Sequence, residues 1–270
     1  MKIKVDGKWL AYDERGVGIP VLLIHGYPLS RKLWEPQLSG LSDTARIFTL
    51  DLRGHGESEV GEGTQTAFSM DMLADDCAAF LDELGVKEPV VLGGLSMGGY
   101  VVLAFARKYP QRLAGLILAA TRAGADSLEG KANRDKAVAQ AKEGGAIAIA
   151  DAMLPKMMSP KTYIANPGLV SGVYEMMKGT SVHGIIGDLL GLKDRPDSSS
   201  SLPEIKVPTL LLYGADDQII PQADMESMAT AIPGAQFVVI PQAGHLLNLE
   251  QPEEFNQSVK VFLNQLRERE

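Results

Sequence analysis

The chain has 270 residues, of which 45% are hydrophobic and 22% charged, a composition typical of globular proteins. Its formal net charge of −8 disfavours binding to nucleic acid or to an anionic membrane surface. No apolar run is long enough to span a bilayer, and the first residues lack the pattern of a signal peptide. A single cysteine, Cys77, excludes an internal disulfide framework. We therefore expect a cytoplasmic protein without nucleic-acid or membrane partners.

The chain opens with a predicted β-hairpin, because Asp6 and Gly7 separate two strand-like segments. Later, short and unbroken apolar runs have the composition of strands buried on both faces. These runs are residues 21–24, 47–50, 90–92, 116–120, 209–213 and 237–240. Helical spacing of apolar residues appears at 73–84, 100–108, 225–232 and 255–266. This alternation predicts an α/β fold whose central sheet is mostly parallel and carries helices on both faces.

The alternation stops at residues 122–201. This stretch is rich in Ala, Met and Gly, has a helical character, contains no convincing strand and ends in a serine run. We interpret it as a helical cap inserted at one edge of the sheet. The predicted organisation is therefore a core domain formed by residues 1–121 and 202–270, and a cap domain formed by residues 122–201.

The motif GLSMG at residues 94–98 carries the functional prediction. It follows the strand-like run 90–92 and opens the predicted helix that ends at Lys108, which is the strand–turn–helix context of a nucleophile elbow. Glycines on both sides allow a turn too tight for a Cβ atom. The turn would present the Ser96 hydroxyl at the carboxyl end of the sheet, beside a helix N-terminus. Ser96 is therefore the predicted nucleophile.

A serine nucleophile needs a base and an acid that orients the base. His245 follows the last strand-like run and is the predicted base, whereas the other three histidines are interpreted as structural. Asp216 and Asp217 both follow the run 209–213, and we prefer Asp217 as the acid. No two histidines are spaced by four residues, so no metal site is predicted. Backbone N–H groups of Met97 and Tyr27 are the predicted oxyanion hole.

Four further residues are candidates for the substrate pocket. His25 ends the first buried strand, and Arg122 follows the strand-like run 116–120, where it could either meet a substrate carboxylate or form a structural ion pair. Met153 and Met157 belong to a methionine cluster in the insert, which could be the core of the cap or a pliable lining for an acyl group.

Taken together, several motifs resemble the α/β-hydrolase family, in the branch that holds small carboxylesterases and β-ketoadipate enol-lactonases. They lie at residues 25–28 (HGYP), 51–58 (DLRGHGES), 94–99 (GLSMGG), 214–221 (GADDQIIP) and 243–245 (AGH), the last followed by 250–252 (EQP). The resemblance implies a cap over the active site and an acid three residues after Gly214, which supports Asp217. Serine at the elbow differs from the aspartate of haloalkane dehalogenases and epoxide hydrolases. Leu95 before the serine differs from the asparagine usual in C–C hydrolases.

The sequence thus predicts a cofactor-free carboxylic ester hydrolase that forms an acyl-enzyme on Ser96 and acts on a small-molecule ester. The alternatives are an enol-lactonase or C–C hydrolase with the same triad, a cofactor-free perhydrolase, and a non-enzymatic ligand sensor. Residues 122–201 contain ten basic and nine acidic side chains. This balance predicts no cationic clamp, so we expect a promiscuous enzyme that prefers neutral esters of short to medium acyl chains.

Overall fold

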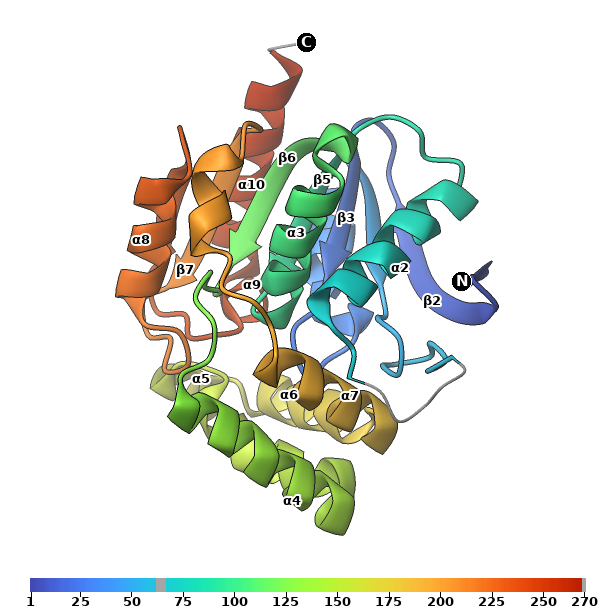
Figure 1. The fold of residues 1–270 in the computed structure, drawn as a ribbon. Coiled ribbons are helices and arrows are strands. Elements are labelled where there is room, and N and C mark those ends of the chain that lie inside the picture. The colour runs from blue at the N-terminus through green and yellow to red at the C-terminus, as the bar shows by residue number, and fades with distance from the viewer. Residues whose placement is uncertain (62–66, 269–270) are drawn as a thin grey trace.

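The computed structural model describes residues 1–61 and 67–268. Its centre is an eight-stranded sheet with the order β1-β2-β4-β3-β5-β6-β7-β8 (Figure 1). The pairs β1–β2 and β2–β4 are antiparallel, and all five remaining pairs are parallel. The prediction of a mostly parallel sheet is confirmed.

Strands lie where the apolar runs predicted them. The opening hairpin joins β1 (Lys2–Val5) to β2 (Lys8–Arg15) through Asp6 and Gly7, which both have positive φ as a tight two-residue turn requires. The other strands are β3 (Pro20–Ile24), β4 (Arg46–Leu50), β5 (Val90–Leu95), β6 (Leu113–Ala119), β7 (Thr209–Gly214) and β8 (Gln236–Ile240). Every residue of β3, β5 and β7 is buried, because helices cover both faces of the sheet.

Two hydrophobic cores form, one on each face of the sheet. Alternate residues of β3 point to opposite faces, so Leu22 and Ile24 enter one core while Val21 and Leu23 enter the other. The first core packs under α2 (Met70–Glu83), α3 (Met97–Lys108) and α8 (Gln222–Ala231). The second packs under α1 (Glu35–Gly40), α9 (Leu247–Glu250) and α10 (Pro252–Arg267). Short 3₁₀ turns at η1 (Arg31–Trp34) and η2 (Pro110–Arg112) complete these layers.

Helices alone fill the long connection between β6 and β7. They are α4 (Leu128–Met153), α5 (Pro160–Ala165), α6 (Pro167–Lys178) and α7 (Val182–Lys193), with 3₁₀ turns η3 (Leu154–Lys156) and η4 (Ser199–Glu204). The structure describes every residue from 122 to 201, and none belongs to a strand. In Figure 1 these helices form a layer at the end of the sheet toward which β6 points. The insert therefore lies at the carboxyl ends of the parallel strands.

The last helix of the insert packs unusually closely against the loops of the sheet. A Cβ atom on Gly184 would lie 2.3 Å from the Gly54 carbonyl oxygen, and one on Gly191 would lie 1.8 Å from the Phe68 carbonyl oxygen. Ser181, the N-cap of α7, donates its hydroxyl to the Gly54 carbonyl over 2.7 Å. Glycine at these positions thus lets α7 sit directly on the core. No helix within the described residues has both the length and the apolar character to cross a membrane.

Candidate active site

Ser96 stands at the turn between β5 and α3. Its backbone has φ 54° and ψ −113°, a conformation that non-glycine residues rarely adopt and that costs about 1–3 kcal/mol. The Ser96 N–H donates to the Ala119 carbonyl over 2.9 Å, which fixes the turn against β6. A Cβ on Gly94 would meet the Gly98 backbone at 2.3 Å, and one on Gly98 would meet the Ile24 carbonyl at 2.2 Å. Both glycines of the motif are therefore required by the close approach of the backbone.

His245 and Asp217 are in direct contact. The His245 Nδ1 atom lies 2.9 Å from Asp217 Oδ2, and both side chains are almost completely buried. The second carboxylate oxygen of Asp217 accepts the backbone N–H groups of Ile219 (2.7 Å) and Ile220 (3.1 Å). Since a carboxylate can only accept, His245 Nδ1 carries the proton in this hydrogen bond and Nε2 is left as a proton acceptor.

The loops that carry the acid and the base are packed backbone to backbone. The Asp216 N–H donates to the Ala243 carbonyl over 2.8 Å, and a Cβ on Gly214 would lie 2.1 Å from the Gly244 carbonyl. Asp216, the alternative acid, is an exposed residue, whereas the carboxylate of Asp217 is fully buried. The structure thus pairs His245 with Asp217 and not with Asp216.

The two predicted oxyanion donors lie on either side of Ser96. Met97 is the first residue of α3, and Tyr27 follows Gly26 in the loop after β3. A Cβ on Gly26 would lie 3.4 Å from Ser96 Cβ, so this loop passes directly beside the nucleophile. Within the described part of the chain, neither the Met97 nor the Tyr27 N–H has a hydrogen-bond partner. Both donors are thus available beside the serine, as an oxyanion hole needs.

Glu250 belongs to a segment, residues 250–252 (EQP), that contributes to the family resemblance, but the sequence predicted no role for it. Its Oε1 atom accepts the Gly244 N–H over 2.8 Å, next to His245. Its Oε2 atom accepts the Ser159 N–H (2.7 Å) and the Thr162 hydroxyl (2.6 Å), both in the insert. One carboxylate therefore joins the loop of the base to the insert. The only signal in the sequence was its place just after the AGH motif.

His25 serves the architecture of the loops. It is fully buried, its Nδ1 atom donates to the Gly26 carbonyl (2.9 Å), and its Nε2 atom accepts the Leu52 N–H (3.0 Å). Burial, with the neighbouring His55, holds the pKa of His25 well below its ordinary value. The imidazole is therefore neutral, and both of its nitrogen atoms are already engaged.

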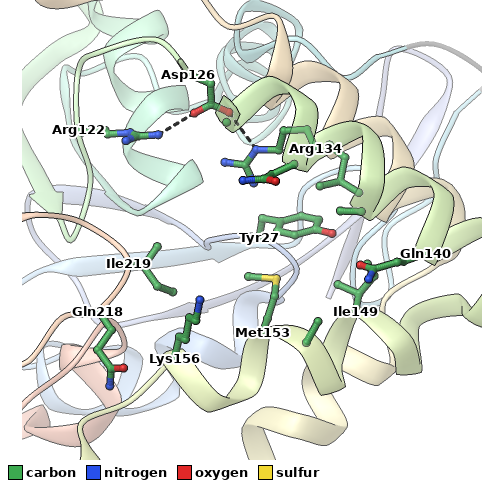
Figure 2. A pocket seen from close by; sticks show the side chains of 15 residues that line it. Tyr27, Arg122, Asp126, Arg134, Gln140, Ile149, Met153, Lys156, Gln218 and Ile219 are labelled. Atoms are coloured by element: carbon green, nitrogen blue, oxygen red, sulfur yellow. Dashed lines mark hydrogen bonds and ion pairs between the residues drawn. The ribbon is translucent and has the colours of Figure 1, made fainter. Parts of the chain in front are cut away.

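A cavity of about 430 Å³ lies between α4, the Tyr27 loop and the loop after β7 (Figure 2). Its volume is in the range of small-molecule sites. Tyr27, Arg122 and Met153 line it, as do Gln218 and Ile219, which follow the acid Asp217. Two of the four candidate pocket residues are elsewhere: His25 is held in the loop network described above, and Met157 is buried in the hydrophobic core. The cavity thus adjoins the loops that carry the acid and one oxyanion donor.

Charge is distributed unevenly around this cavity. Arg122, Arg134 and Lys156 line it together with a single carboxylate, that of Asp126. Asp126 is buried and accepts hydrogen bonds from Arg122 (2.7 Å), Arg134 (3.0 Å) and Arg195 (2.7 Å). Burial tends to raise the pKa of Asp126, but Arg195 and Arg134 lower it overall. The balanced charge of the insert as a whole therefore does not hold at the cavity, where cations are in excess.

Among residues 1–61 and 67–268, no group of three or more His, Cys, Asp or Glu side chains is arranged to hold a metal ion. Ser96, His245 and Asp217 remain the candidate catalytic residues of the described site. Their order in the chain is serine, then aspartate, then histidine, as in α/β-hydrolases.

Comparison with known proteins finds similar structures over nearly the whole chain. The chain is 43% identical to a thermophilic esterase from Thermogutta terrifontis whose structure has malate bound, with a TM-score of 0.95 over 98% of this chain and 99% of that one. The enol-lactonase from Burkholderia xenovorans superposes with a TM-score of 0.88 at 28% identity, over 98% of this chain and 100% of that one.

A longer relative is the dihydrolipoyllysine-residue acetyltransferase component of the acetoin cleaving system of Pseudomonas putida. It is 32% identical over 97% of this chain and 68% of its own length. The model of the alpha/beta hydrolase fold family matches residues 19–252, which include all three residues of the candidate triad. The chain belongs to the α/β-hydrolase fold family.

Proposed function

We propose that the protein is a serine-dependent carboxylic ester hydrolase with Ser96 as nucleophile, His245 as base and Asp217 as the acid that orients the base. The hydrogen bond between His245 Nδ1 and Asp217 Oδ2 carries this proposal, because it fixes the tautomer in which Nε2 can accept a proton. The strained turn at Ser96 supports it, since such strain is concentrated at functional sites. The relatives, an esterase and an enol-lactonase among them, are consistent with ester chemistry.

In the proposed reaction, Ser96 Oγ attacks the ester carbonyl carbon and its proton passes to His245 Nε2. The N–H groups of Met97 and Tyr27 stabilise the negative oxygen of the tetrahedral intermediate. Its collapse breaks the bond to the alcohol oxygen, which takes the proton from His245 and leaves an acyl-enzyme on Ser96. Water then attacks the acyl carbon while His245 accepts its proton. The second collapse releases the carboxylic acid and returns the proton to Ser96.

Residues 122–201 form the lid domain of this enzyme in our proposal, and residues 1–121 and 202–270 form its catalytic domain. The position of the insert at the carboxyl ends of the strands supports this division, because the nucleophile elbow opens at the same end. The cavity between α4 and the core loops is the proposed substrate pocket. Its volume of about 430 Å³ suits an ester with a short to medium acyl chain.

The test is the hydrolysis of a small ester, such as 4-nitrophenyl butyrate, by the Ser96→Ala variant. The variant loses the nucleophile, and we expect kcat/KM to fall at least about a thousandfold, with a residual rate from binding and the oxyanion hole. Ser200→Ala, at an exposed serine at the end of the insert, is the matched control and retains the wild-type rate. A serine-directed phosphonate labels the wild-type protein on Ser96 once per chain. Turnover by Ser96→Ala that matches the wild type excludes the mechanism, and a single burst without turnover by the wild type indicates a sensor.

A further inference from the structure

The cavity next to the loop that follows Asp217 is lined by more cationic than anionic side chains. Arg134 donates its Nε to Asp126, and neither of its terminal Nη groups has a hydrogen-bond partner among the described residues. Lys156 has no ion-pair partner in the same part of the chain. Figure 2 shows Arg134 and Lys156 facing the same space from opposite sides, with Tyr27 and Met153 nearby. Two separate cationic groups are therefore directed at one cavity in a protein whose net charge is −8.

Asp126 orients the arginines without cancelling them. It is shared by Arg122, Arg134 and Arg195, so three guanidinium groups meet one carboxylate. The second acidic neighbour is Asp224, 4.0 Å from Arg122, and its side chain is 40% exposed. Asp126 and Asp224 together therefore offset the charge of Arg122. The terminal nitrogens of Arg134 and the ammonium group of Lys156 can still bind an anion in the cavity. A guanidinium held by its Nε presents its two terminal nitrogens as a fork, which matches the two oxygens of a carboxylate.

We propose that this cavity selects esters that carry a free carboxylate, with Arg134 and Lys156 as the residues that bind it. The remaining lining supports a small aliphatic ligand, because Ile149, Met153, Leu189 and Ile219 provide an apolar wall for a few methylene groups. The cavity reaches Gln218 and Ile219, which follow Asp217, and Tyr27, which carries a proposed oxyanion donor. The proposal therefore places the ester group of a ligand anchored here on the side of the cavity that faces these loops. This inference rests on the proposed ester hydrolase function and replaces the expected preference for neutral esters.

The experiment compares substrates of the same shape that differ only in charge. Monomethyl glutarate carries a carboxylate on the acyl side, and methyl 5-methylhexanoate has an isopropyl group in its place. For a carboxylate on the alcohol side, 4-acetoxybutanoate is compared with 4-methylpentyl acetate. We expect kcat/KM of the wild type to be about tenfold or more higher for the anionic member of one pair, the value of one charge-assisted hydrogen bond. The pair that shows this preference identifies the side of the ester that lies in the cavity.

Variants then assign the preference to the two cations. In Arg134→Gln and in Lys156→Met, we expect kcat/KM for the preferred anionic ester to fall about tenfold and that for its neutral partner to change less than about threefold. Lys156 is exposed and unpaired among the described residues, so its variant tests the inference even if Arg134→Gln is unstable. Lys136→Gln, at an exposed lysine of α4 outside the cavity, is the control for a loss of charge. Added salt lowers the preference of the wild type as well.

The outcomes separate the two proposals. If Ser96→Ala keeps its activity, the proposed function is wrong. If Ser96→Ala is inactive but the wild type hydrolyses the neutral esters as well as the anionic ones, the ester hydrolase stands and the carboxylate inference is overturned. The inference is also overturned if a preference exists and Lys156→Met and Arg134→Gln leave it unchanged.

Discussion

At the scale of single residues, Asp217 shows how a loop can fix the orientation of the proposed catalytic acid. Its Oδ1 atom accepts two backbone N–H groups of its own loop, so only Oδ2 is free to contact His245. The carboxylate cannot rotate without leaving two partly buried backbone donors unpaired, which costs up to about 1–3 kcal/mol for each. The acid is thus held in place by the turn that follows β7.

Replacement of Asp217 by asparagine should therefore impair catalysis more than folding. The amide oxygen has to stay with the N–H groups of Ile219 and Ile220, so the NH₂ group faces His245 Nδ1 and donates to it. The imidazole then carries its proton on Nε2 and is no longer able to accept that of Ser96. We expect kcat to fall by about three to four orders of magnitude, measured on a nitrophenyl ester.

Asp216→Asn is the matched control for this prediction. The Asp216 side chain is exposed, and its backbone N–H, which donates to Ala243, is unchanged by the substitution. We expect kcat within about twofold of the wild type, as for surface substitutions remote from the chemistry. If Asp216→Asn is the impaired variant and Asp217→Asn is active, the acid has been assigned to the wrong residue.

At the scale of elements, local sequence patterns predicted the core of the fold well. Strands β3 to β8 lie at the predicted apolar runs, β1 and β2 form the predicted hairpin, and α2, α3, α8 and α10 lie at the predicted amphipathic segments, with ends that differ by one residue in β6, α2 and α8. The elbow at residues 94–98 could be predicted because its glycines, serine and flanking strand and helix are neighbours in the chain. Such features depend on contacts among nearby residues, which a sequence displays directly.

The insert was less predictable because its contacts are distant in the sequence. The path of α4 changes at Gly145, which has φ 68°. The pair Gly144 and Gly145 is a sequence signal for such a break, and the prediction of a helical insert made no use of it. Likewise, Arg122, Arg134 and Lys156 are spread over two elements and a loop, so a count of charges along residues 122–201 averages them with acids that lie elsewhere. A count of charges does not show which side chains the fold brings together.

Glu250 links two of these elements, and its loss should uncouple them. Glu250→Gln preserves the shape of the side chain but replaces one acceptor oxygen by an NH₂ donor, which faces the N–H of Gly244 or the donors of Ser159 and Thr162. We expect a loss of about 2 kcal/mol in the free energy of unfolding, because the three hydrogen bonds that Glu250 accepts are made to a charged carboxylate and such bonds are stronger than those to a neutral amide. We also expect a lower kcat with little change in KM, since the loop of His245 loses an anchor.

Denaturant unfolding and steady-state kinetics on one ester test this prediction. Glu253→Gln, at an exposed glutamate in the first turn of α10, removes the same charge from the same region without touching the insert. Wild-type stability and kcat in Glu250→Gln would show that its three hydrogen bonds do not position the base.

At the scale of the whole molecule, the insert and the core are joined by buried polar contacts. Thr180 donates its hydroxyl to the Pro28 carbonyl over 2.7 Å, at the loop that carries Tyr27. The His55 Nε2 atom, in the loop after β4, lies 3.0 Å from Asp188 Oδ2 on α7, and both side chains are fully buried. These contacts attach α7 to the loops beside the proposed active site. A buried pair of this kind makes the attachment sensitive to pH.

The pKa values of the pair determine the sign of that sensitivity. Burial lowers the pKa of His55, but the Asp188 carboxylate opposes this and raises it overall above its ordinary value of 6.5. Burial raises the pKa of Asp188. The folded protein therefore binds protons at both groups more readily than the unfolded chain does. The stabilisation from His55 is fully present below about pH 6.5 and is lost as the pH rises through the folded-state pKa, and the shift of Asp188 acts in the same direction.

Asp188→Asn makes this testable, because asparagine has the same shape and does not titrate. Above the folded-state pKa of His55 the wild type holds a buried carboxylate beside a neutral imidazole, which the variant avoids. We expect the free energy of unfolding of the wild type, relative to that of Asp188→Asn, to decrease by at least about 1 kcal/mol between about pH 6 and about pH 9.

His25, whose ring lies 4.8 Å from that of His55, stays neutral throughout this range because burial keeps its pKa well below the ordinary value. Asp194→Asn, at an exposed aspartate next to the end of α7, should show no such trend. A stability difference between wild type and Asp188→Asn that stays constant with pH would mean that the pair does not change its protonation on folding.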